Sequence, residues 1–553
     1  MCLLNLKWLY LKICKLKSLD MIKPLCFIVV FVIPSLLAVS QPKVTVGKPY
    51  AVIDADNKYY FSSKGEILTV KVTPKAKAII LQKMNAEGLT FQKIKMYNDF
   101  PKDFQIEKIT EFKNRYYVFY SLWENDEEQL FSREIDFAAG SFKGAGKKII
   151  SVNEKITGSL TRSGFWRLSA SDKFDFYFSY DSTSMVVQYR LKPEKKNDSK
   201  NYDVIGVHVF DKDLKVKWTK KVQMPYTEKK MDNLDYSVDS KGNVYIVTRI
   251  FNDNTTDLKK RGEDDANYNL EILKVAASTG TITSTKVNVA DKFVKTTWLY
   301  ESAQGHMICA GFYNIGKNTA NADGVILFKL SPDGKLFDLN SYEIPVSILN
   351  QYASGKSKRT NERKDNNDKA EFENLKLQQV VVQADGSIVL VSEQSYVQSH
   401  TSYMNGRSST YYTYHSNDIF VTKITASGKL AWMNKLPKRQ KGGAGFRGMS
   451  HRYFLGSENH YFMFLDNEKN LDLPLTEVPA RHMDGAGGFL TAYKVNDKTG
   501  EVSKISLLDT RNVNGMEVFQ FAPHRMMATA PNTLVFEAYK KKKEDILVKV
   551  VVN

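Results

Sequence analysis

One pattern of apolar and polar positions recurs along the chain: an apolar run, a turn that contains Gly or Asp, and a second apolar run. The pattern occupies residues 78–94, 270–287, 324–339, 418–433 and 487–505. Apolar runs on both sides of a short Gly-bearing turn predict a β-hairpin. The same hairpin repeated along a whole chain is typical of an array of β units.

A second hairpin, less regular than the first, precedes most copies of it. Its copies carry Gly or Asn in the turn and occupy residues 109–122, 234–251, 298–313, 377–394 and 453–466. Two hairpins in succession form a four-stranded antiparallel unit, the size of one propeller blade. The sequence therefore predicts an all-β fold, a β-propeller of four-stranded antiparallel blades. A pair of β-sandwiches is the alternative, but sandwiches would not repeat one hairpin phrase.

The outer hairpins give the number of blades. There are seven when the more degenerate copies at residues 130–142 and 204–218 are included. After the seventh, the chain ends at Asn553 with a unit that lacks its outer strand. A strand from residues 43–53 would complete that unit, so we expect eight blades, closed by pairing of the N- and C-terminal strands. Seven blades remain possible if residues 59–72 pair differently.

The long connections of the predicted fold should all lie on one face. In a four-stranded meander the first and third turns share one end, and the middle connection and the crossover to the next unit share the other. The extra length falls in the second class, at residues 191–203, 252–268, 351–372, 393–417 and 466–487. Insertions on one face often mark a binding face, although surface loops also tolerate insertions without a function. The first three insertions are polar and of mixed charge, which predicts linkers without packed structure.

The last two insertions carry residue types suited to recognition. Residues 393–417 combine tyrosines with Ser, Gly and Asn, which together give rigid contact area and adaptable hydrogen bonds. Residues 466–487 hold Arg and His before a Gly-rich run whose backbone can approach a ligand closely. The structural alternatives are a long hairpin and a tight re-entry into the next strand. The candidate ligand-binding residues are Tyr403, Arg407, Tyr411, Tyr412, Tyr414, His415, Arg481, His482 and Asp484.

The first forty residues have the layout of a secretory signal peptide. Lys23 precedes a short apolar segment, and small residues lie at Ala38 and Ser40 before Gln41. Met21 is a natural start, so residues 1–20 are interpreted as a possible start-site artefact. We expect residues 1–40 to be removed and residues 41–553 to form a single propeller domain, exported to the periplasm or secreted, with no transmembrane segment in the mature chain. An uncleaved membrane anchor is the alternative.

Charge narrows the choice of partner. The chain has 79 basic and 61 acidic residues, a net charge of +18, and the loss of five lysines and one aspartate with residues 1–40 leaves about +14. A positive excess attracts acidic glycans, lipopolysaccharide phosphates, nucleic acid or membrane surfaces. The lysines are spread over strands and loops rather than along one stripe, so no nucleic-acid interface is predicted. The expected partner is an unknown protein or an anionic glycan of the cell envelope.

No catalytic or metal-binding motif is present in the sequence. No two of the eight histidines stand at a zinc-ligand spacing with a Cys or Glu partner, and no Gly-x-Ser-x-Gly elbow occurs. Cys309, the one cysteine after residue 40, lies in an apolar strand and is expected to be buried. No metal, cofactor or catalytic residue is predicted. Paired carboxylates from different blades would escape such a search, so a propeller enzyme acting on polysaccharide is the alternative function.

Two hairpins end in a Trp after the turn, LKVKW at Trp218 and GKLAW at Trp432. They resemble the repeats of quinoprotein-type (PQQ-type) propellers and of the outer-membrane assembly lipoprotein built from such repeats. The resemblance implies that each Trp docks against the next blade. The chain is also similar to exported β-propeller proteins of Gram-negative bacteria. We therefore expect an exported β-propeller that acts as a binding or scaffolding protein of the cell envelope, with its ligand unknown.

Overall fold

Short strands, several of them buried on both faces, make up most of the described part of the protein in the computed structural model. The structure describes residues 42–552 except residues 77, 158–172, 194–198, 260–264, 290–291, 316–320, 367–369, 405–406, 444, 447, 485–486, 514, 521 and 541–542. The expected signal peptide, residues 1–40, lies outside the described residues. No described helix is long and apolar enough to span a membrane.

The described strands form eight sheets, numbered here in chain order, and every strand pair is antiparallel except β29 (Gln440–Gly442) with β32 (His482–Met483). Sheets 1 to 3 contain β3 (Asn57–Ser63), β4 (Glu66–Val72), β5 (Ile79–Asn85) and β6 (Thr90–Tyr97); β7 (Gln105–Phe112), β8 (Arg115–Glu124), β9 (Glu127–Asp136), β10 (Ser141–Phe142) and β11 (Lys147–Val152); and β12 (Ile156–Thr157), β13 (Asp175–Phe178), β14 (Ser184–Leu191), β15 (Tyr202–Asp211) and β16 (Val216–Thr227). Sheets 4 and 5 contain β17 (Met231–Val238), β18 (Val244–Phe251), β19 (Tyr268–Val275) and β20 (Ile282–Val287); and β21 (Phe293–Glu301), β22 (Met307–Asn314), β23 (Gly324–Leu330) and β24 (Leu336–Glu343).

The remaining elements follow the same plan with additions. Sheet 6 contains β25 (Leu375–Val382), β26 (Ile388–Met404), β27 (Arg407–Ile424), β28 (Leu430–Leu436), β29 (Gln440–Gly442) and β32 (His482–Met483). Sheet 7 contains β30 (Arg452–Leu455), β31 (Asn459–Asp466), β33 (Phe489–Asn496) and β34 (Val502–Asp509). Sheet 8 contains β35 (Val518–Gln520), β36 (Met526–Ala530), β37 (Thr533–Lys540), β38 (Glu544–Val551), β1 (Lys43–Val46) and β2 (Tyr50–Ala51). The described helices are η1 (Pro74–Ala76), α2 (Val346–Leu349), α3 (Gly355–Asp365), η2 (Glu468–Asn470) and η3 (Pro523–Arg525).

The two ends of the described chain pair in sheet 8. β1 runs antiparallel to β38, from Lys43 opposite Val551 to Val46 opposite Val548. Val44 and Val46 also pack against the apolar cluster that includes residues of sheets 7 and 8. The first strand therefore occupies the outer position that the last three strands leave open.

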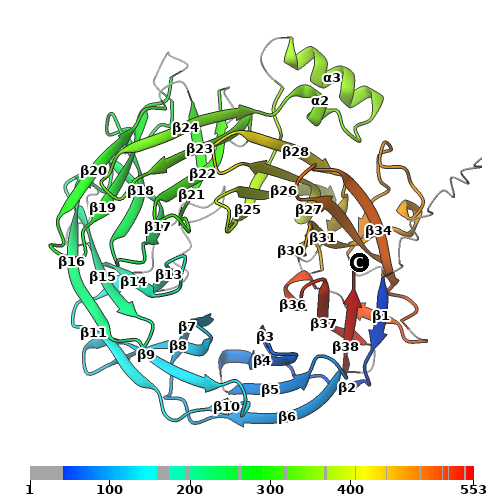
Figure 1. Ribbon diagram of the computed structural model, residues 1–553, viewed down its shortest axis with the longest axis horizontal. Coiled ribbons are helices and arrows are strands. Elements are labelled where there is room, and N and C mark those ends of the chain that lie inside the picture. Colours follow the sequence, from blue (N-terminus) through cyan, green and yellow to red (C-terminus); the bar gives the residue numbers. More distant parts are fainter. Residues whose placement is uncertain are drawn as a thin grey trace, which may run out of the picture. The chain divides into compact units, whose positions relative to one another are not determined.

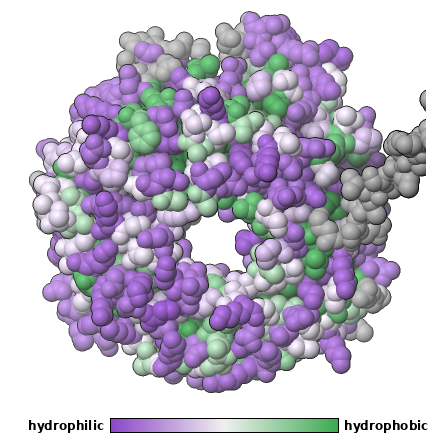
Figure 2. All heavy atoms as spheres, viewed as in Figure 1, coloured by the Kyte–Doolittle hydropathy of each residue, from purple (hydrophilic) through white to green (hydrophobic). Residues whose placement is uncertain are grey.

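Apolar side chains from neighbouring sheets pack together in eight clusters of described residues. Each cluster joins one sheet to the next in order, and Ile67 and Met84 of sheet 1 pack with Met527, Val535 and Leu547 of sheet 8. Within residues 42–552 the sheets follow one another around a central opening (Figure 1). Hydrophilic residues dominate the face shown in the space-filling view and surround that opening (Figure 2). The core of the protein is therefore divided into layers between sheets.

Lysines of the repeated hairpin strengthen these junctions. Four of them, together with Lys549 on β38, each donate a hydrogen bond to a main-chain carbonyl in the turn that precedes the outer strand of the following sheet. These pairs are Lys83 with Ala138, Lys274 with Pro332 (2.6 Å), Lys329 with Ala426 (2.7 Å), Lys423 with Asp497 (3.1 Å) and Lys549 with Glu87 (2.8 Å). We call these five residues the junction lysines. The repeated hairpin thus encodes the contact between sheets as well as each sheet.

Both tryptophans that carry the quinoprotein resemblance also contact the next sheet. Trp218 Nε1 donates to the Gly242 carbonyl at 2.9 Å, and Trp432 Nε1 donates to the Asp497 carbonyl at 3.1 Å. The docking that the resemblance implied is confirmed for these two side chains. Cys309 is buried on β22, as expected from its apolar strand.

One of the three predicted linkers was assigned wrongly. Residues 351–372 contain helix α3, which lies with α2 between β24 and β25 (Figure 1). Its sequence, GKSKRTNERKD, has no apolar stripe and none of its residues is buried. Hydrophobic periodicity could not reveal this helix. Its start is marked instead by Ser354, whose side chain accepts a hydrogen bond from the Ser357 N–H at 3.2 Å.

Candidate functional site

The five long connections occur where the sequence placed them. Four join the second and third strands of a sheet, and residues 351–372 join β24 to β25 of the next sheet. In an antiparallel sheet these two kinds of connection share one end. The long connections therefore extend from the same end of their own sheets, opposite the short turns that the junction lysines contact.

The Tyr-rich insertion is a two-stranded ribbon that extends β26 and β27 beyond the rest of sheet 6. Its register runs from Ser395 opposite Ser416 to Met404 opposite Arg407. Tyr403 and Arg407 therefore belong to its tip, and their side chains lie outside the described part of the structure. The structural alternative of a long hairpin is correct for this segment.

The short strand β29 brings the two candidate segments together. It pairs antiparallel with β27, with His415 opposite Lys441, and parallel with β32, with Gln440 opposite His482. Backbone hydrogen bonds continue this pairing on both sides, from His482 N–H to the Arg439 carbonyl and from Asp484 N–H to the Lys441 carbonyl, at 2.8 and 2.9 Å. We call the ribbon residues 394–417 with residues 439–442 and 481–484 the platform.

Paired residues of the platform place aromatic side chains in one row. Tyr396 stacks on His415 with ring centroids 4.5 Å apart, and His400 stacks on Tyr411 at 4.9 Å. Thr413 Oγ1 lies 3.0 Å from His400 Nε2 and 3.1 Å from His415 Nε2, which links the two stacks. Because strand residues alternate between faces, these residues share one side of the ribbon, the front face of the platform.

Cations continue the front face beyond the ribbon. Lys441 is the strand partner of His415, and Arg439 and Arg481 precede β29 and β32 by one residue each. No carboxylate of the described residues forms an ion pair with Lys441 or Arg481. Burial, Lys441, Arg481 and His400 together lower the pKa of His415, so its ring is neutral near pH 7. The front face therefore combines one exposed ring, Tyr411, and partly or fully buried rings with cations that no described carboxylate pairs.

The other aromatic candidates differ in exposure. Tyr411 and Tyr412 are 55% and 50% exposed. Tyr412 is the strand partner of Ser399, which places it on the back of the ribbon. Tyr414, also on the back, meets Phe446 edge to face with ring centroids 5.3 Å apart. Large exposed rings are therefore present on both sides of the ribbon.

His482 faces inward. Its side chain is 3% exposed, and its Nε2 atom has no hydrogen-bond partner among the described residues. Burial, with smaller effects of Arg511 and Lys438, lowers the pKa of His482 to about 4. Asp484 is half-buried and is fixed through its main-chain N–H. The structure thus brings His415 close to Arg481, but only Arg481 is exposed, and both His415 and His482 are buried.

A buried ionic network anchors the platform from behind. Lys438 Nζ donates to Ser416, to Gln440 Oε1 at 3.1 Å and to Glu393 Oε1 at 3.0 Å. Glu393 also receives hydrogen bonds from Ser450 and lies 3.0 Å from His451 Nδ1. Although burial favours the neutral acid, Lys438 and His451 lower the pKa of Glu393 to about 2. Sequence reasoning missed this network because Glu393, Lys438 and His451 lie on separate segments with no motif in common.

A pocket of about 520 Å³ opens between α3 and the base of the ribbon. The front-facing residue Arg439 borders it, as do Gln394 and Asn417 of the ribbon and Lys356 and Thr360 of α3. The pocket and the platform therefore share residues and form one continuous site.

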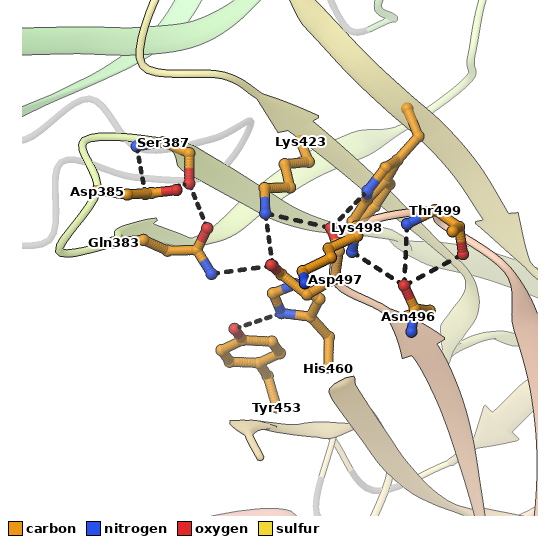
Figure 3. Close-up of polar contacts among 11 residues, drawn as sticks. Gln383, Asp385, Ser387, Lys423, Tyr453, His460, Asn496, Asp497, Lys498 and Thr499 are labelled. Carbon is orange, nitrogen blue, oxygen red and sulfur yellow. Dashed lines mark hydrogen bonds and ion pairs between the residues drawn. The ribbon is translucent and has the colours of Figure 1, made fainter. Parts of the chain in front are cut away.

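Two other clusters contain residue types that enzymes often use in catalysis. In the first, Asp497 Oδ1 lies 2.7 Å from His460 Nε2, and His460 Nδ1 lies 2.9 Å from the Tyr453 hydroxyl (Figure 3). The His460 side chain is fully buried, and Asp497 also pairs with Lys423. His460 and His451 bind different carboxylates, so they do not share a metal. This cluster joins sheets 6 and 7 and has no exposed nucleophile.

The second cluster pairs two carboxylates. Arg190 bridges Asp203 and Glu228, with its Nη2 atom 2.7 Å from Glu228 Oε1. Burial and the neighbouring Asp203 raise the pKa of Glu228 to about 7. An arginine that occupies both carboxylates leaves no room for a scissile bond between them. Among the described residues no group of three or more His, Cys, Asp and Glu side chains could hold a metal ion.

Comparisons with known proteins identify no family. No protein-family model matches the chain, and no curated protein matches it. Solved structures that resemble it include prolyl oligopeptidase B from Galerina marginata, at 10% identity and a TM-score of 0.38 over 92% of this chain. This chain spans 55% of that enzyme's length.

Two further solved structures are a β-propeller domain and a quinohemoprotein enzyme. The β-propeller domain of the Trilobed protease from Pyrococcus furiosus matches 83% of this chain and 97% of its own at 8% identity and a TM-score of 0.33. A quinohemoprotein alcohol dehydrogenase from Pseudomonas putida HK5 matches 92% of this chain and 76% of its own at 9% identity and a TM-score of 0.39. β-propeller and quinoprotein structures are thus among the proteins that this chain is similar to.

Proposed function

We propose that this chain is an exported, eight-bladed β-propeller that acts as a binding or scaffolding module of the cell envelope. In this proposal β1 completes the eighth blade, and the platform is the contact surface for a protein or an anionic glycan. The eight sheets, the apolar cluster between sheets 8 and 1, and the pairing of β1 with β38 support the ring.

The observation that carries the binding role is the joining of two distant segments by β29. Residues 394–417 and 481–484 both pair with this strand, and the front face that results has stacked rings and cations that form no ion pair with a carboxylate of the described residues. Aromatic side chains and arginines are enriched at recognition surfaces. The buried Glu393–Lys438 pair fixes the surface in place before a partner binds.

The test replaces the exposed rings of the ribbon. Tyr411→Ser with Tyr412→Ser removes most of the aromatic area, and Tyr202→Ser, at a comparably exposed ring in sheet 3, is the matched control. Binding of the purified protein to an envelope polysaccharide fraction and to an envelope protein fraction is measured by biolayer interferometry. We expect at least a tenfold loss of affinity in the ribbon variant and no loss in the control. Equal binding by both variants would show that the platform is not the contact surface, and binding to neither fraction would overturn the binding role.

Export has a separate test. The full chain is expressed in a Gram-negative host, and the mass of the protein in the periplasmic and extracellular fractions is measured. We expect a chain that begins at Gln41. An intact chain retained in the cytoplasm would contradict the export proposal and would leave the platform unaffected.

A further inference from the structure

Helix α3 is held over the pocket without apolar packing. Eleven residues are too few for a stable helix in water unless a tertiary contact supports it, and that contact is usually an apolar face. None of the α3 residues is buried. Its polar contacts with the rest of the chain include a partly buried hydrogen bond from Asn361 to Asn350 at 2.9 Å and an exposed one from Lys364 to Glu373 at 3.2 Å.

The side of α3 that faces the pocket is hydrophilic. Lys356, Ser357, Thr360, Asn361 and Lys364 line the pocket, and their spacing of three to four residues places them on one face of the helix. The opposite wall presents amide groups of the ribbon base, Gln394 and Asn417. Hydrogen-bonding groups therefore line both walls, beside the apolar side chains of Leu349, Phe372 and Val478, which suits a ligand with many hydroxyl groups.

The carboxylates of the pocket are already compensated. Asp418 lies 3.4 Å from Lys435 Nζ, and Glu373 pairs with Lys364. Glu371 accepts hydrogen bonds from Asn314 and Asn321 at 2.7 and 2.8 Å. The negative charge of the pocket is thus engaged by neighbouring side chains.

The cations are not compensated in the same way. Lys356, Arg439, Lys441 and Arg481 form no ion pair with any carboxylate of the described residues. Among the described residues, the Arg439 side chain donates to the Pro479 carbonyl, at 3.2 Å. Arg439 borders the pocket and alternates with Lys441 along the front face, so these four residues form a cationic track from the pocket to the stacked rings.

We propose that a linear acidic polysaccharide binds along this cationic track. Sugar hydroxyls occupy the pocket beneath α3, and acidic groups repeated along the chain contact Arg439, Arg481 and Lys441 beside the rings of Tyr396 and Tyr411. The inference rests on the proposed binding function and selects a glycan over a protein partner. A repeated charge on an extended polymer matches a track whose cations are spread over two strands and a helix.

The test measures binding of three polysaccharides. Polygalacturonate carries carboxylate groups, heparin carries sulfate groups, and dextran is uncharged. Lys441→Gln with Arg481→Gln removes two cations of the track. Lys335→Gln with Lys212→Gln, at exposed positions of other sheets, is a control with the same loss of charge. We expect binding of at least one acidic polymer, no binding of dextran, a tenfold or greater loss of affinity in the track variant and less than a twofold loss in the control. Whichever acidic polymer binds more tightly identifies the acidic group.

Hydrogen exchange of α3 is a second readout, independent of the substitutions. The amides of α3 should exchange more slowly when the acidic polymer is bound, because sugar hydroxyls supply the contacts that the helix lacks. Equal loss of affinity in track and control variants would reveal attraction by net charge alone and would overturn the inference. Binding only to an envelope protein, abolished by the Tyr411→Ser and Tyr412→Ser changes, would overturn the glycan and leave the proposed function standing.

Discussion

Lys423 and Asp497 join sheet 6 to sheet 7 through two contacts of one ammonium group. Lys423 Nζ lies 2.6 Å from Asp497 Oδ1 and 3.1 Å from the Asp497 carbonyl oxygen. Gln383 and His460 point at the same carboxylate (Figure 3). Burial alone would raise the pKa of Asp497, but hydrogen bonds from Lys423, Gln383 and His460 hold it below its ordinary value. A lysine of the repeated hairpin thus becomes part of the joint between two sheets.

Replacement of this lysine should destabilise the protein. Lys423→Met keeps the length of the side chain but removes the donor, and its largely buried carboxylate partner loses its positive charge. We expect the free energy of unfolding to fall by about 2 to 3 kcal/mol, measured by urea denaturation. Lys335→Met, at an exposed ion pair with Asp333, is the control and should change stability by less than about 0.5 kcal/mol. A loss as small as that of the control would contradict a structural role for the junction lysines.

Disruption of the first strand should open sheet 8. Val46 pairs with Val548 and packs against the cluster between sheets 7 and 8, so Val46→Asp places a charge in an apolar layer. We expect a loss of about 2 to 4 kcal/mol in the free energy of unfolding. Lys48→Asp, at an exposed position between β1 and β2, is the matched control. Unchanged stability of the Val46 variant would show that β1 contributes nothing to the closure of the ring.

Acid should weaken the anchor of the platform. The pKa of Glu393 is lowered to about 2 in the folded protein, below the value of about 4.3 for a free glutamate. A lowered pKa stabilises the fold above the unfolded value, and this stabilisation is lost as the pH falls from about 4.5 through 2. Glu393→Gln should be less stable than the native chain at pH 6 and should lose less stability between pH 5 and pH 3. Parallel stability curves over this range would contradict the assignment.

Asp235 should have the opposite pH dependence. Its Oδ2 atom accepts the Leu299 N–H at 2.7 Å, and burial raises its pKa to about 7. A raised pKa means that the folded protein holds the proton more tightly, so stability falls as the pH rises from about 4 through 7. Asp235→Asn retains a side-chain acceptor for the Leu299 N–H and removes the titration. The difference in unfolding free energy between the variant and the native chain, measured at pH 5 and pH 8, should grow in favour of the variant. No change in this difference would contradict the burial of the charge.

Much of the architecture could be predicted because hairpins are local. The apolar runs around Gly334 and Gly428 each fold against the sequence next to them, so alternation and a Gly turn were sufficient to place them. Helix α3 could not be predicted, because none of its residues is buried and its stability does not arise from an apolar stripe. The roles of Lys83 and Lys549 were also hidden, since each acceptor lies on another sheet.

The candidate site, too, could be predicted from the sequence only in part. Its sequence indicated Tyr411, His415 and Arg481 through residue type, and of these Tyr411 and Arg481 are exposed, whereas His415 is buried opposite Lys441. His482 has the same sequence character but turns inward, because the neighbouring positions of a strand face opposite sides. No sequence signal linked Glu393 to Lys438.

The sequence alone determined that the chain forms repeated antiparallel hairpins and that its long connections share one end of their sheets. These properties depend on contacts between residues near one another in the chain, where spacing and turn chemistry are sufficient. Only the tertiary structure decided that β29 joins the ribbon to Arg481 and that α3 covers a pocket. It also decided that the four cations of the cationic track have no carboxylate partner among the described residues. Those properties depend on which distant segments meet, and burial and charge pairing act only once they have met.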